Sequence, residues 1–380
     1  MKKKSILVLS ATAGAGHVRA AEALVEASHL LSLPITIQHI DVLDYTSRPF
    51  KKLYSETYTL IVNNSPKLWG YLYKTTESKS LDRKKSFLMK LFDSFNYQKF
   101  LQALNDHQPD AALCTHFLPY WGISHKMSKP EWRIPFFAVP TDYGIHSLWM
   151  NPWLKRYYVA TAEAAWTIKS RGFSDEKILV TGIPVMPQFG LSVDQHVARE
   201  EFSLDPHTLT IMVLSGGYGV GVLDELVPSV ALFLSKFERK EFQLLVVCGR
   251  NRKLYNKLNA MNFPSNVKVY LYQFVPYIDK LMDCADVLIT KAGGLTVSEA
   301  LAKNLPMIIY DPFPGQEGLN ATYIIERGAA LGAINFSLLN YKLKQLIEEP
   351  RLLEHMKANA KKIARPNAAK EILADVLRNI

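Results

Sequence analysis

The chain has 380 residues, of which 48% are hydrophobic and 21% are charged. This composition excludes a disordered or fibrous protein, and the length is sufficient for two globular domains. The formal net charge of +10 predicts an anionic partner, and the three cysteines, Cys114, Cys248 and Cys284, favour reduced thiols in a cytoplasmic protein.

Short apolar runs alternate with amphipathic segments through residues 1–183, which we predict to be an N-terminal domain. The runs predict parallel strands joined by crossover helices. Strands are expected at residues 5–9, 35–41, 113–115, 136–139, 157–159 and 178–181, and helices at residues 20–31 and 162–171. Polar residues and glycines follow the first short apolar run, which therefore predicts a core strand rather than a signal peptide.

A glycine-rich turn, GAGHVR at residues 14–19, follows the first predicted strand. It lacks the third glycine of the dinucleotide-binding fingerprint, and Arg19 stands where a small residue should pack the helix onto the sheet. This departure disfavours a dehydrogenase. Asp41, at the end of the second predicted strand, keeps that alternative open.

A helical insertion is predicted at residues 45–108, and it concentrates positive charge. Between Arg48 and Phe100, eleven basic residues stand against four acidic ones, and eleven aromatic residues are interleaved. Basic residues near an anionic bilayer contribute on the order of 1 kcal/mol each, and Trp and Tyr favour the headgroup level. The pattern predicts a peripheral membrane surface that includes Lys51, Lys52, Trp69, Lys84 and Lys85.

Two other interpretations of this basic stretch stay open: a solvated basic face over ordinary core aromatics, and a nucleic-acid surface. We expect no nucleic-acid partner, because no nucleic-acid motif is present. The longest uncharged stretches, residues 178–193 and 208–223, contain glycines and fall short of the roughly 20 apolar residues of a membrane span. The expected location is therefore cytoplasmic, with peripheral association at the inner face of the membrane.

Residues 184–206 mix proline, glycine and charge without clear periodicity, and we predict an interdomain linker there. A second alternation over residues 207–364 predicts a C-terminal domain of the same kind. Strands are expected at residues 210–214, 243–248, 267–271, 285–290 and 306–310, and helices at residues 223–237, 253–259, 296–303 and 368–380.

The most informative motif is KAGGLTVSEA at residues 291–300, followed after one apolar strand by PGQE at residues 314–317. A strand, two glycines and a helix in this order form a loop suited to holding phosphate on backbone N–H groups. Glu299 is expected in the first turn of the helix, where its carboxylate can accept hydrogen bonds from the two hydroxyls of a ribose. The second motif is expected to be a rigid turn whose amide and carboxylate suit sugar hydroxyls.

This order of a Gly-Gly-x-Thr-x-x-Glu-Ala helix start and a Pro-Gly-Gln-Glu turn resembles the donor site of nucleotide-sugar glycosyltransferases. The resemblance is to glycosyltransferase family 28, in the branch of the monogalactosyldiacylglycerol synthases and the bacterial processive diacylglycerol glucosyltransferases. The likeness spans almost the whole chain, through further segments at residues 10–17, 139–149, 180–185, 215–220 and 248–251.

The resemblance implies an α/β fold of the GT-B type, with two Rossmann-like domains whose parallel sheets face across a cleft. It implies that the last helix, within residues 365–380, crosses back to the first domain. It also implies an inverting transfer of a hexose from UDP-glucose or UDP-galactose to diacylglycerol, giving a β-glycoside. No cofactor is expected, and the lack of an Asp-x-Asp motif argues against a divalent metal as the main diphosphate clamp.

We expect backbone N–H groups of Gly216, Gly217, Gly293 and Gly294 to stabilise the leaving diphosphate. Arg250 would add a positive charge there. By the resemblance, Phe274 and Val275 would hold uracil, and the PGQE residues would hold the hexose. The full predicted donor-binding set is Gly216, Gly217, Arg250, Phe274, Val275, Gly293, Gly294, Thr296, Glu299, Gln316 and Glu317.

A general base must take the proton of the acceptor hydroxyl, and His17 is the first candidate because it ends a glycine loop and titrates near neutral pH. Asp142 is the second candidate. His116 and His146 remain further ones, and one of these groups can orient His17 instead of replacing it. The predicted acceptor side also includes Gly16, His146 and Trp149.

Three other functions stay open. A transferase of N-acetylglucosamine to a lipid-linked peptidoglycan precursor belongs to the same family. A UDP-sugar 2-epimerase would share the fold and act on the donor alone, and a non-catalytic UDP-sugar sensor would dock on membranes without turnover. The residues do not choose between glucose, galactose and N-acetylglucosamine.

Overall fold

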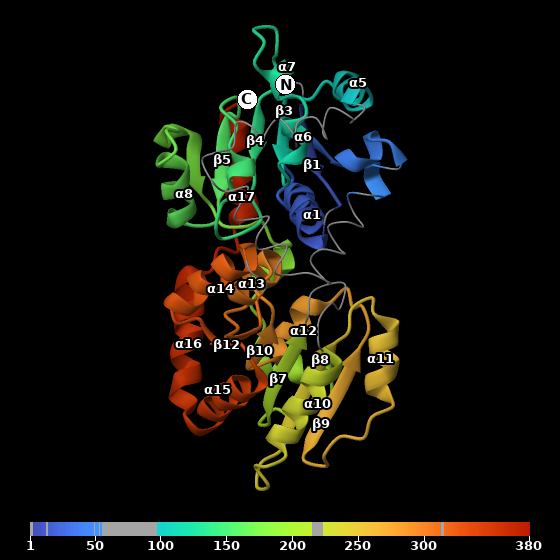
Figure 1. Cartoon of the computed structure of the whole chain (residues 1–380), viewed down its shortest axis with the longest axis vertical. Coiled ribbons are helices and arrows are strands. Elements are labelled where there is room, and N and C mark those ends of the chain that lie inside the picture. The colour runs from blue at the N-terminus through green and yellow to red at the C-terminus, as the bar shows by residue number, and fades with distance from the viewer. Residues whose placement is uncertain are drawn as a thin grey trace. The chain divides into compact units, whose positions relative to one another are not determined.

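The structure is a computed structural model, and it describes residues 3–12, 14–48, 50–52, 54, 97–214, 223–312 and 315–380. The described chain forms two compact units, each built on its own sheet (Figure 1). The first consists mainly of Met1–Pro187 and Arg365–Ile380, and the second of Gln188–Phe313 and Glu317–Ala364. Most of the helical insertion predicted at residues 45–108 lies outside the described residues.

The first unit contains a sheet of six parallel strands in the order β2-β1-β3-β4-β5-β6. The strands are β1 (Lys4–Ser10), β2 (Ile35–Asp41), β3 (Ala111–Cys114), β4 (Phe136–Ala138), β5 (Arg156–Val159) and β6 (Ile178–Val180). The described helices are α1 (Ala15–Leu30), α5 (Tyr97–His107), α6 (Leu118–Trp121), α7 (Ser124–Met127), α8 (Ala162–Lys169) and α17 (Ala368–Arg378). Short 3-10 turns are η1 (Val42–Tyr45), η2 (Ser147–Trp149) and η3 (Asp175–Lys177).

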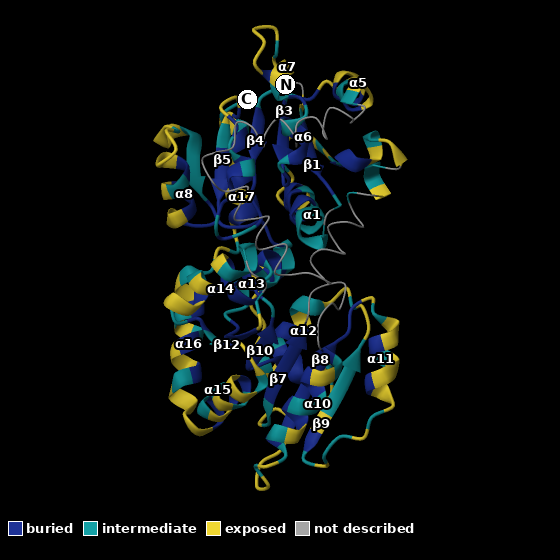
Figure 2. Cartoon of the chain, viewed as in Figure 1, coloured by how far each residue is buried: buried dark blue, intermediate teal, exposed yellow. Residues whose placement is uncertain are grey.

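Alternation along the strands gives this sheet two buried faces. Ile6 and Val8 of β1 join a core that α1 and α17 cover, whereas Leu7 and Leu9 join a core that includes residues of α5, α6 and α8. Because both faces are buried, the central strands β3 and β4 are continuous apolar runs, whereas the edge strand β2 mixes apolar and polar residues. Figure 2 shows the strands largely buried and the exposed residues concentrated on the helices and loops around them.

The C-terminal helix α17 belongs to the first unit and is anchored there by Asp375, which is 5% exposed. The Asp375 carboxylate accepts a hydrogen bond from the Tyr158 hydroxyl at 2.9 Å and pairs with the Arg156 guanidinium at 2.5 Å. Burial alone would raise the pKa of Asp375, but the hydrogen bonds from Arg156, Tyr158 and Arg378 lower it. The last helix is thus fixed to β5 by charged groups as well as by apolar packing.

The second unit contains a parallel sheet in the order β12-β11-β10-β7-β8-β9. The strands are β7 (Leu209–Leu214), β8 (Phe242–Val247), β9 (Val267–Tyr272), β10 (Val287–Thr290), β11 (Met307–Tyr310) and β12 (Ala330–Ala333). The described helices are α9 (Gln195–Glu201), α10 (Leu223–Leu234), α11 (Arg252–Asn259), α12 (Ile278–Cys284), α13 (Gly294–Ala302), α14 (Gln316–Glu326), α15 (Phe336–Glu348) and α16 (Pro350–Ile363). A 3-10 turn, η4 (Pro187–Gly190), precedes α9.

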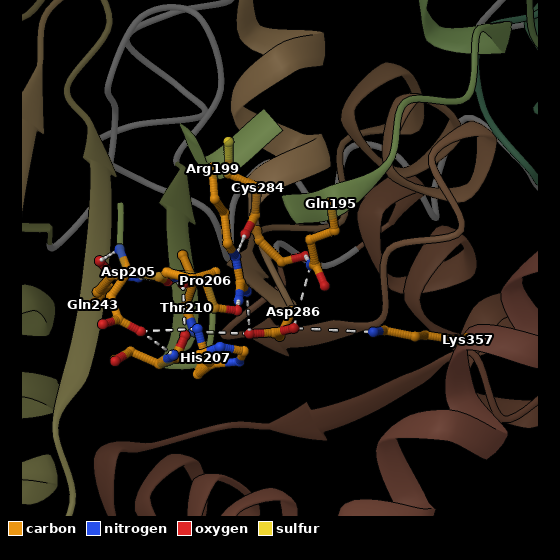
Figure 3. A network of polar contacts seen from close by, with 12 residues as sticks. Gln195, Arg199, Asp205, Pro206, His207, Thr210, Gln243, Cys284, Asp286 and Lys357 are labelled. Atoms are coloured by element: carbon orange, nitrogen blue, oxygen red, sulfur yellow. Dashed lines mark hydrogen bonds and ion pairs between the residues drawn. The ribbon is translucent and has the colours of Figure 1, made fainter. Parts of the chain in front are cut away.

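The segment predicted to be an interdomain linker, residues 184–206, contains helix α9, which packs on α12. Arg199 of α9 is only 4% exposed. Its guanidinium donates to the carbonyl oxygens of Cys284 at 2.9 Å and Pro206 at 2.8 Å, and to the Asp286 carboxylate at 2.7 Å (Figure 3). A helix of two turns is too short to show a periodicity in the sequence, and its place is decided by these buried bonds.

Asp286 joins this helix to the start of the second sheet. Its carboxylate accepts the backbone N–H of Thr210 at 2.8 Å and the side-chain amide of Gln195 at 3.3 Å, and the Lys357 ammonium lies 3.9 Å away (Figure 3). The amide of Gln243, which is fully buried, continues the network to the Thr210 hydroxyl at 2.9 Å. Buried charge is tolerated here because the groups around it supply paired hydrogen bonds.

Candidate functional site

Parallel sheets bind ligands beyond the carboxyl ends of their strands, at the point where successive connections leave in opposite directions. In the first sheet this point lies between β1 and β3, because β2 is on one side of β1 and β3 to β6 are on the other. In the second sheet it lies between β7 and β10. His17 follows β1 and the Gly293-Gly294 pair follows β10, so each predicted motif stands at the switch point of its own sheet.

The turn after β1 places His17 in the first turn of α1. Gly14 precedes the helix with a φ of 94°, a left-handed conformation that glycine adopts without strain. The His17 Nδ1 atom lies 2.7 Å from the carbonyl oxygen of Thr115, which follows β3. In return, the Thr115 hydroxyl donates to the His17 carbonyl oxygen at 2.9 Å.

A third loop reaches the same imidazole. Thr141, which is 4% exposed and follows β4, places its hydroxyl oxygen 2.9 Å from the His17 Nδ1 atom. The next residue, Asp142, is partly exposed. The structure therefore brings the loop of the second candidate base to the first candidate, His17.

The contacts of His17 fix its tautomer. A carbonyl oxygen can only accept, so Nδ1 carries the ring proton and Nε2 presents a lone pair when the ring is neutral. Although the residue keeps partial exposure, the ring is enclosed by protein, and this burial lowers its pKa to about 4, with the bond to Thr115 opposing the shift. The imidazole is therefore neutral at pH 7, as a general base must be.

The other two candidate histidines are placed differently. His116 and His146 are 3% and 5% exposed, and in each the Nδ1 atom accepts a backbone N–H, from Leu118 at 3.0 Å and from Leu148 at 3.1 Å. A ring nitrogen that accepts a hydrogen bond has no proton, so in both rings the proton is on Nε2. Neither ring has a lone pair to offer on that nitrogen, and this disfavours both as the base.

Asp41, which kept the dinucleotide alternative open, is engaged within its own loop. Its carboxylate accepts the Leu43 N–H at 2.9 Å, which caps η1, and it also accepts the Thr12 hydroxyl. Both carboxylate oxygens therefore already accept hydrogen bonds from the loop itself. The local geometry thus strengthens the case against a dehydrogenase.

The glycine loop of the second unit begins helix α13. Gly293 precedes the helix and Gly294 is its first residue. Gly293 has an ordinary φ of −66°, and no described atom lies within 4 Å of the place where a Cβ would stand. Neither strain nor packing against the described chain accounts for this glycine, whereas the close approach of a ligand to the backbone would.

Two expectations for the donor motifs need correction. Glu299 is the sixth residue of α13 and so lies in its second turn, because the helix begins at Gly294 rather than at Thr296. Gln316 and Glu317 are the first two residues of α14 and not part of a rigid turn. Both glycines were expected to precede the helix, but only Gly293 does; Gly294 is tolerated as the first helical residue, where the N–H has no intrahelical partner.

Two residues of this site had no role assigned from the sequence. Asn320 of α14 is fully buried, and its side-chain amide donates to the Ala292 carbonyl oxygen at 2.9 Å, which ties the helix of the second motif to the loop of the first. Lys291 directly follows β10 and is partly buried. Burial lowers its pKa, and the nearby carboxylates of Glu317 and Asp311 oppose that shift. The position of a polar residue directly after a buried strand was the available signal for Lys291, whereas the contact of Asn320 left no signal in the sequence.

The predicted uracil and diphosphate residues form a contact of their own. Phe274, in the loop after β9, is 54% exposed, and the guanidinium of Arg250, after β8, lies 5.1 Å from its ring centre. Val275 is partly buried beside it. An exposed aromatic ring paired with a cation is a suitable surface for stacking a nucleobase. Gly216 and Gly217 lie outside the described residues.

The predicted membrane and acceptor residues are only partly described. Lys51 pairs with Asp44, Lys52 is exposed and Gly16 is partly buried. Trp149 is 5% exposed and packs in the core, so it cannot be part of an exposed membrane surface. Trp69, Lys84 and Lys85 lie outside the described residues. In the part of the chain that is described, no helix has the length and apolar character needed to cross a bilayer.

Two family models match the chain, one after the other. The model described as monogalactosyldiacylglycerol (MGDG) synthase matches residues 17–185, and that of the glycosyltransferase family 28 C-terminal domain matches residues 210–377. The chain belongs to glycosyltransferase family 28. The first match begins at His17 and the second includes both donor motifs, so the predicted family is confirmed.

Curated relatives match over nearly the full length. A processive diacylglycerol beta-glucosyltransferase of Bacillus subtilis (strain 168) is 28% identical over 386 residues, covering 99% of this chain and 95% of the relative. A protein of the same name from Bacillus cytotoxicus is 29% identical over 384 residues, covering 99% and 94%.

Solved structures show the same fold. MurG of Acinetobacter baumannii superposes with a TM-score of 0.63 at 17% identity, covering 99% of this chain and 100% of that chain. A UDP-GlcNAc 2-epimerase of Neisseria meningitidis gives a TM-score of 0.58 at 14% identity, covering 98% and 100%. The predicted α/β fold of the GT-B type, with two Rossmann-like units, is confirmed.

Proposed function

We propose that this family 28 member transfers a hexose from a UDP-sugar to diacylglycerol and makes a β-glycosyl diacylglycerol. The observation that carries the proposal is the full-length similarity to processive diacylglycerol beta-glucosyltransferases, which includes both switch-point motifs. The epimerases among the solved structures share the fold at low identity, and fold alone does not assign an activity.

The second unit would bind the donor. Backbone N–H groups at Gly293 and Gly294, with the start of α13 behind them, would hold the diphosphate. Glu299 would accept hydrogen bonds from the ribose hydroxyls, and Phe274 would contact uracil. Asn320 supports this arrangement, because its bond to Ala292 fixes the glycine loop to the helix that begins with Gln316 and Glu317.

Gln316 and Glu317 would bind the hexose, at the first turn of α14. Arg250 and Lys291 would add positive charge near the leaving diphosphate, where negative charge develops in the transition state. The proposed donor is UDP-glucose or UDP-galactose, and the proposal includes no metal or cofactor.

The first unit would supply the base. His17 Nε2 would take the proton of the acceptor hydroxyl as its oxygen forms a bond to the anomeric carbon. The bond from that carbon to the UDP oxygen breaks on the opposite face, and UDP leaves with the electron pair. A single displacement of this kind inverts an α-linked donor to a β-glycoside. Asp142 follows Thr141, whose hydroxyl lies 2.9 Å from the His17 Nδ1 atom, and its carboxylate would help to stabilise the imidazolium that forms.

The acceptor is a lipid, so the enzyme must work at a membrane surface. The basic and aromatic stretch between Arg48 and Phe100 supports peripheral association with an anionic bilayer at the inner face of the cytoplasmic membrane. Lys52, which is exposed, and Lys51 belong to its described part.

The proposal is tested by incubating the full chain with vesicles that contain diacylglycerol and an anionic lipid. UDP-glucose, UDP-galactose and UDP-N-acetylglucosamine are supplied in turn, and lipids are analysed by mass spectrometry. A hexosyl diacylglycerol from one donor supports the proposal, and a ladder of products shows repeated addition. If every donor binds but none gives a lipid product, the diacylglycerol assignment is wrong. Interconversion of UDP-sugars without lipid would then indicate an epimerase.

A further inference from the structure

His116 lies against the proposed base, and its tautomer is fixed by the backbone. The ring centres of His116 and His17 are 4.6 Å apart, with the rings nearly perpendicular. His116 Nδ1 accepts the Leu118 N–H at 3.0 Å, so the ring proton is on Nε2. Burial lowers the pKa of His116 far below its usual range, and the neighbouring His17 lowers it further. His116 is therefore a neutral ring that offers one N–H donor.

This N–H has no acceptor among the described residues, although His116 is only 3% exposed. A buried polar side chain ordinarily makes its hydrogen bonds, and an available donor next to a proposed base is the exception. The exception is explained if a ligand supplies the acceptor.

The surroundings indicate what kind of ligand this would be. The His116 ring contacts three aromatic side chains, with ring-centre distances of 4.3 Å to Phe117, 6.3 Å to Tyr54 and 6.5 Å to Trp149. A neutral donor between aromatic walls suits an uncharged oxygen on an apolar molecule, because an anion would be desolvated there without a compensating charge. An ester oxygen of a neutral glycerolipid has this chemistry.

We propose that His116 binds the acceptor, donating its Nε2–H to an ester oxygen of diacylglycerol and so holding the lipid beside His17. This inference rests on the proposed function, and it assigns His116 to acceptor binding rather than to proton abstraction. The donor sugar makes no contact with His116 in this account.

Two substitutions separate binding from a structural role. In His116→Asn the side-chain oxygen can replace Nδ1 and accept the Leu118 N–H, but the Nε2–H is lost. In His116→Gln the side-chain amide can replace the Nε2–H, but the bond from Leu118 is lost. For both variants we would measure the melting temperature, KM for UDP-glucose, and KM for diacylglycerol expressed as its mole fraction in vesicles. The control is His29→Asn, which removes an exposed histidine.

The expected result is that His116→Asn raises KM for diacylglycerol about tenfold, the equivalent of one neutral hydrogen bond, and leaves KM for UDP-glucose and the melting temperature unchanged. His116→Gln should keep the lipid KM near that of the wild type even if its melting temperature falls. The inference is overturned if His116→Asn has a normal lipid KM, or if both variants lose lipid binding only in proportion to stability. If the wild-type protein makes no glycolipid, the proposed function fails and the inference fails with it.

Discussion

His17 and Thr115 hold each other at two points, where the side chain of each residue bonds to the main-chain carbonyl of the other. The ring donates from Nδ1 to the Thr115 carbonyl oxygen at 2.7 Å, and the Thr115 hydroxyl donates to the His17 carbonyl oxygen at 2.9 Å. This reciprocal pair joins the start of α1 to the end of β3, on the two sides of the switch point of the first sheet. It orients the proposed base by main-chain contacts, which side-chain substitutions elsewhere leave intact.

Replacing His17 by Asn should remove the base and keep the fold. The Asn amide can take the place of Nδ1–H and donate to the Thr115 carbonyl oxygen, whereas nothing replaces Nε2. We expect kcat for glycolipid formation to fall by about 10²–10⁴-fold, the range of general-base contributions, with UDP affinity unchanged. Steady-state kinetics and calorimetry measure the two quantities. A variant that keeps more than a tenth of the wild-type kcat would exclude His17 as the base.

The acid side of the pH profile should reflect the lowered pKa of His17. Because this pKa is about 4, the ring stays unprotonated as pH falls from 7 to 5, and kcat/KM should fall only near pH 4. Stability follows the same linkage: the unfolded ring titrates at its ordinary pKa of 6.5, so between pH 6.5 and 4 the unfolded state binds more protons and folding stability decreases as pH falls. An activity midpoint near pH 6.5 would contradict the placement of the ring.

Glu299→Ala should weaken UDP binding, because the carboxylate would no longer accept the ribose hydroxyls. Hydrogen bonds to a charged group contribute about 1.5–3 kcal/mol, so the Kd for UDP should rise by about 10- to 150-fold. Calorimetry with UDP measures this directly. Glu238→Ala, which changes an exposed carboxylate in the turn after α10, is the matched control and should bind UDP normally. Equal affinities for the two variants would remove Glu299 from the donor site.

Arg199→Met tests the buried network that holds α9 in the second unit. The change leaves the Asp286 carboxylate, which is 9% exposed, without its guanidinium partner, and removing one member of a buried pair costs about 3–5 kcal/mol. Urea unfolding followed by fluorescence should show an earlier transition for the second unit. Lys280→Met, on the neighbouring α12, removes an exposed ion pair with Glu201 of α9 and should have little effect. Similar midpoints for the two variants would show that the network does not stabilise the unit.

The fold was predicted well where a strand or helix is specified by its own short stretch of sequence. Buried runs such as β8 and β10 are short, apolar and bounded by glycine, proline or polar residues, and the structure places strands there. Helix α9 was missed because its position depends on the bonds of Arg199 to Cys284 and Asp286, two partners distant in the sequence. The start of α13 was placed two residues late, since glycines at a helix start carry no propensity signal that separates helix from loop.

The motifs of the candidate site could be predicted from the sequence, but the contacts between their side chains could not. His17 and the glycine pair follow predicted strands, and parallel topology brings such positions to the switch points. The partners of His17 could not be foreseen, because Thr115 contributes a main-chain carbonyl, which any residue carries. The contribution of Asn320 was equally hidden, since it depends on the fold of α14 beside the glycine loop.

The most direct test of the account is the anomeric configuration of the lipid product. The wild-type protein is supplied with UDP-α-glucose, UDP-α-galactose and diacylglycerol vesicles, and proton NMR of the purified lipid gives the coupling of the anomeric proton. A single displacement at the anomeric carbon predicts a β-linked hexosyl diacylglycerol. An α-linked glycolipid would contradict the inverting step, and consumption or binding of the UDP-sugar with no glycolipid would contradict transfer to diacylglycerol.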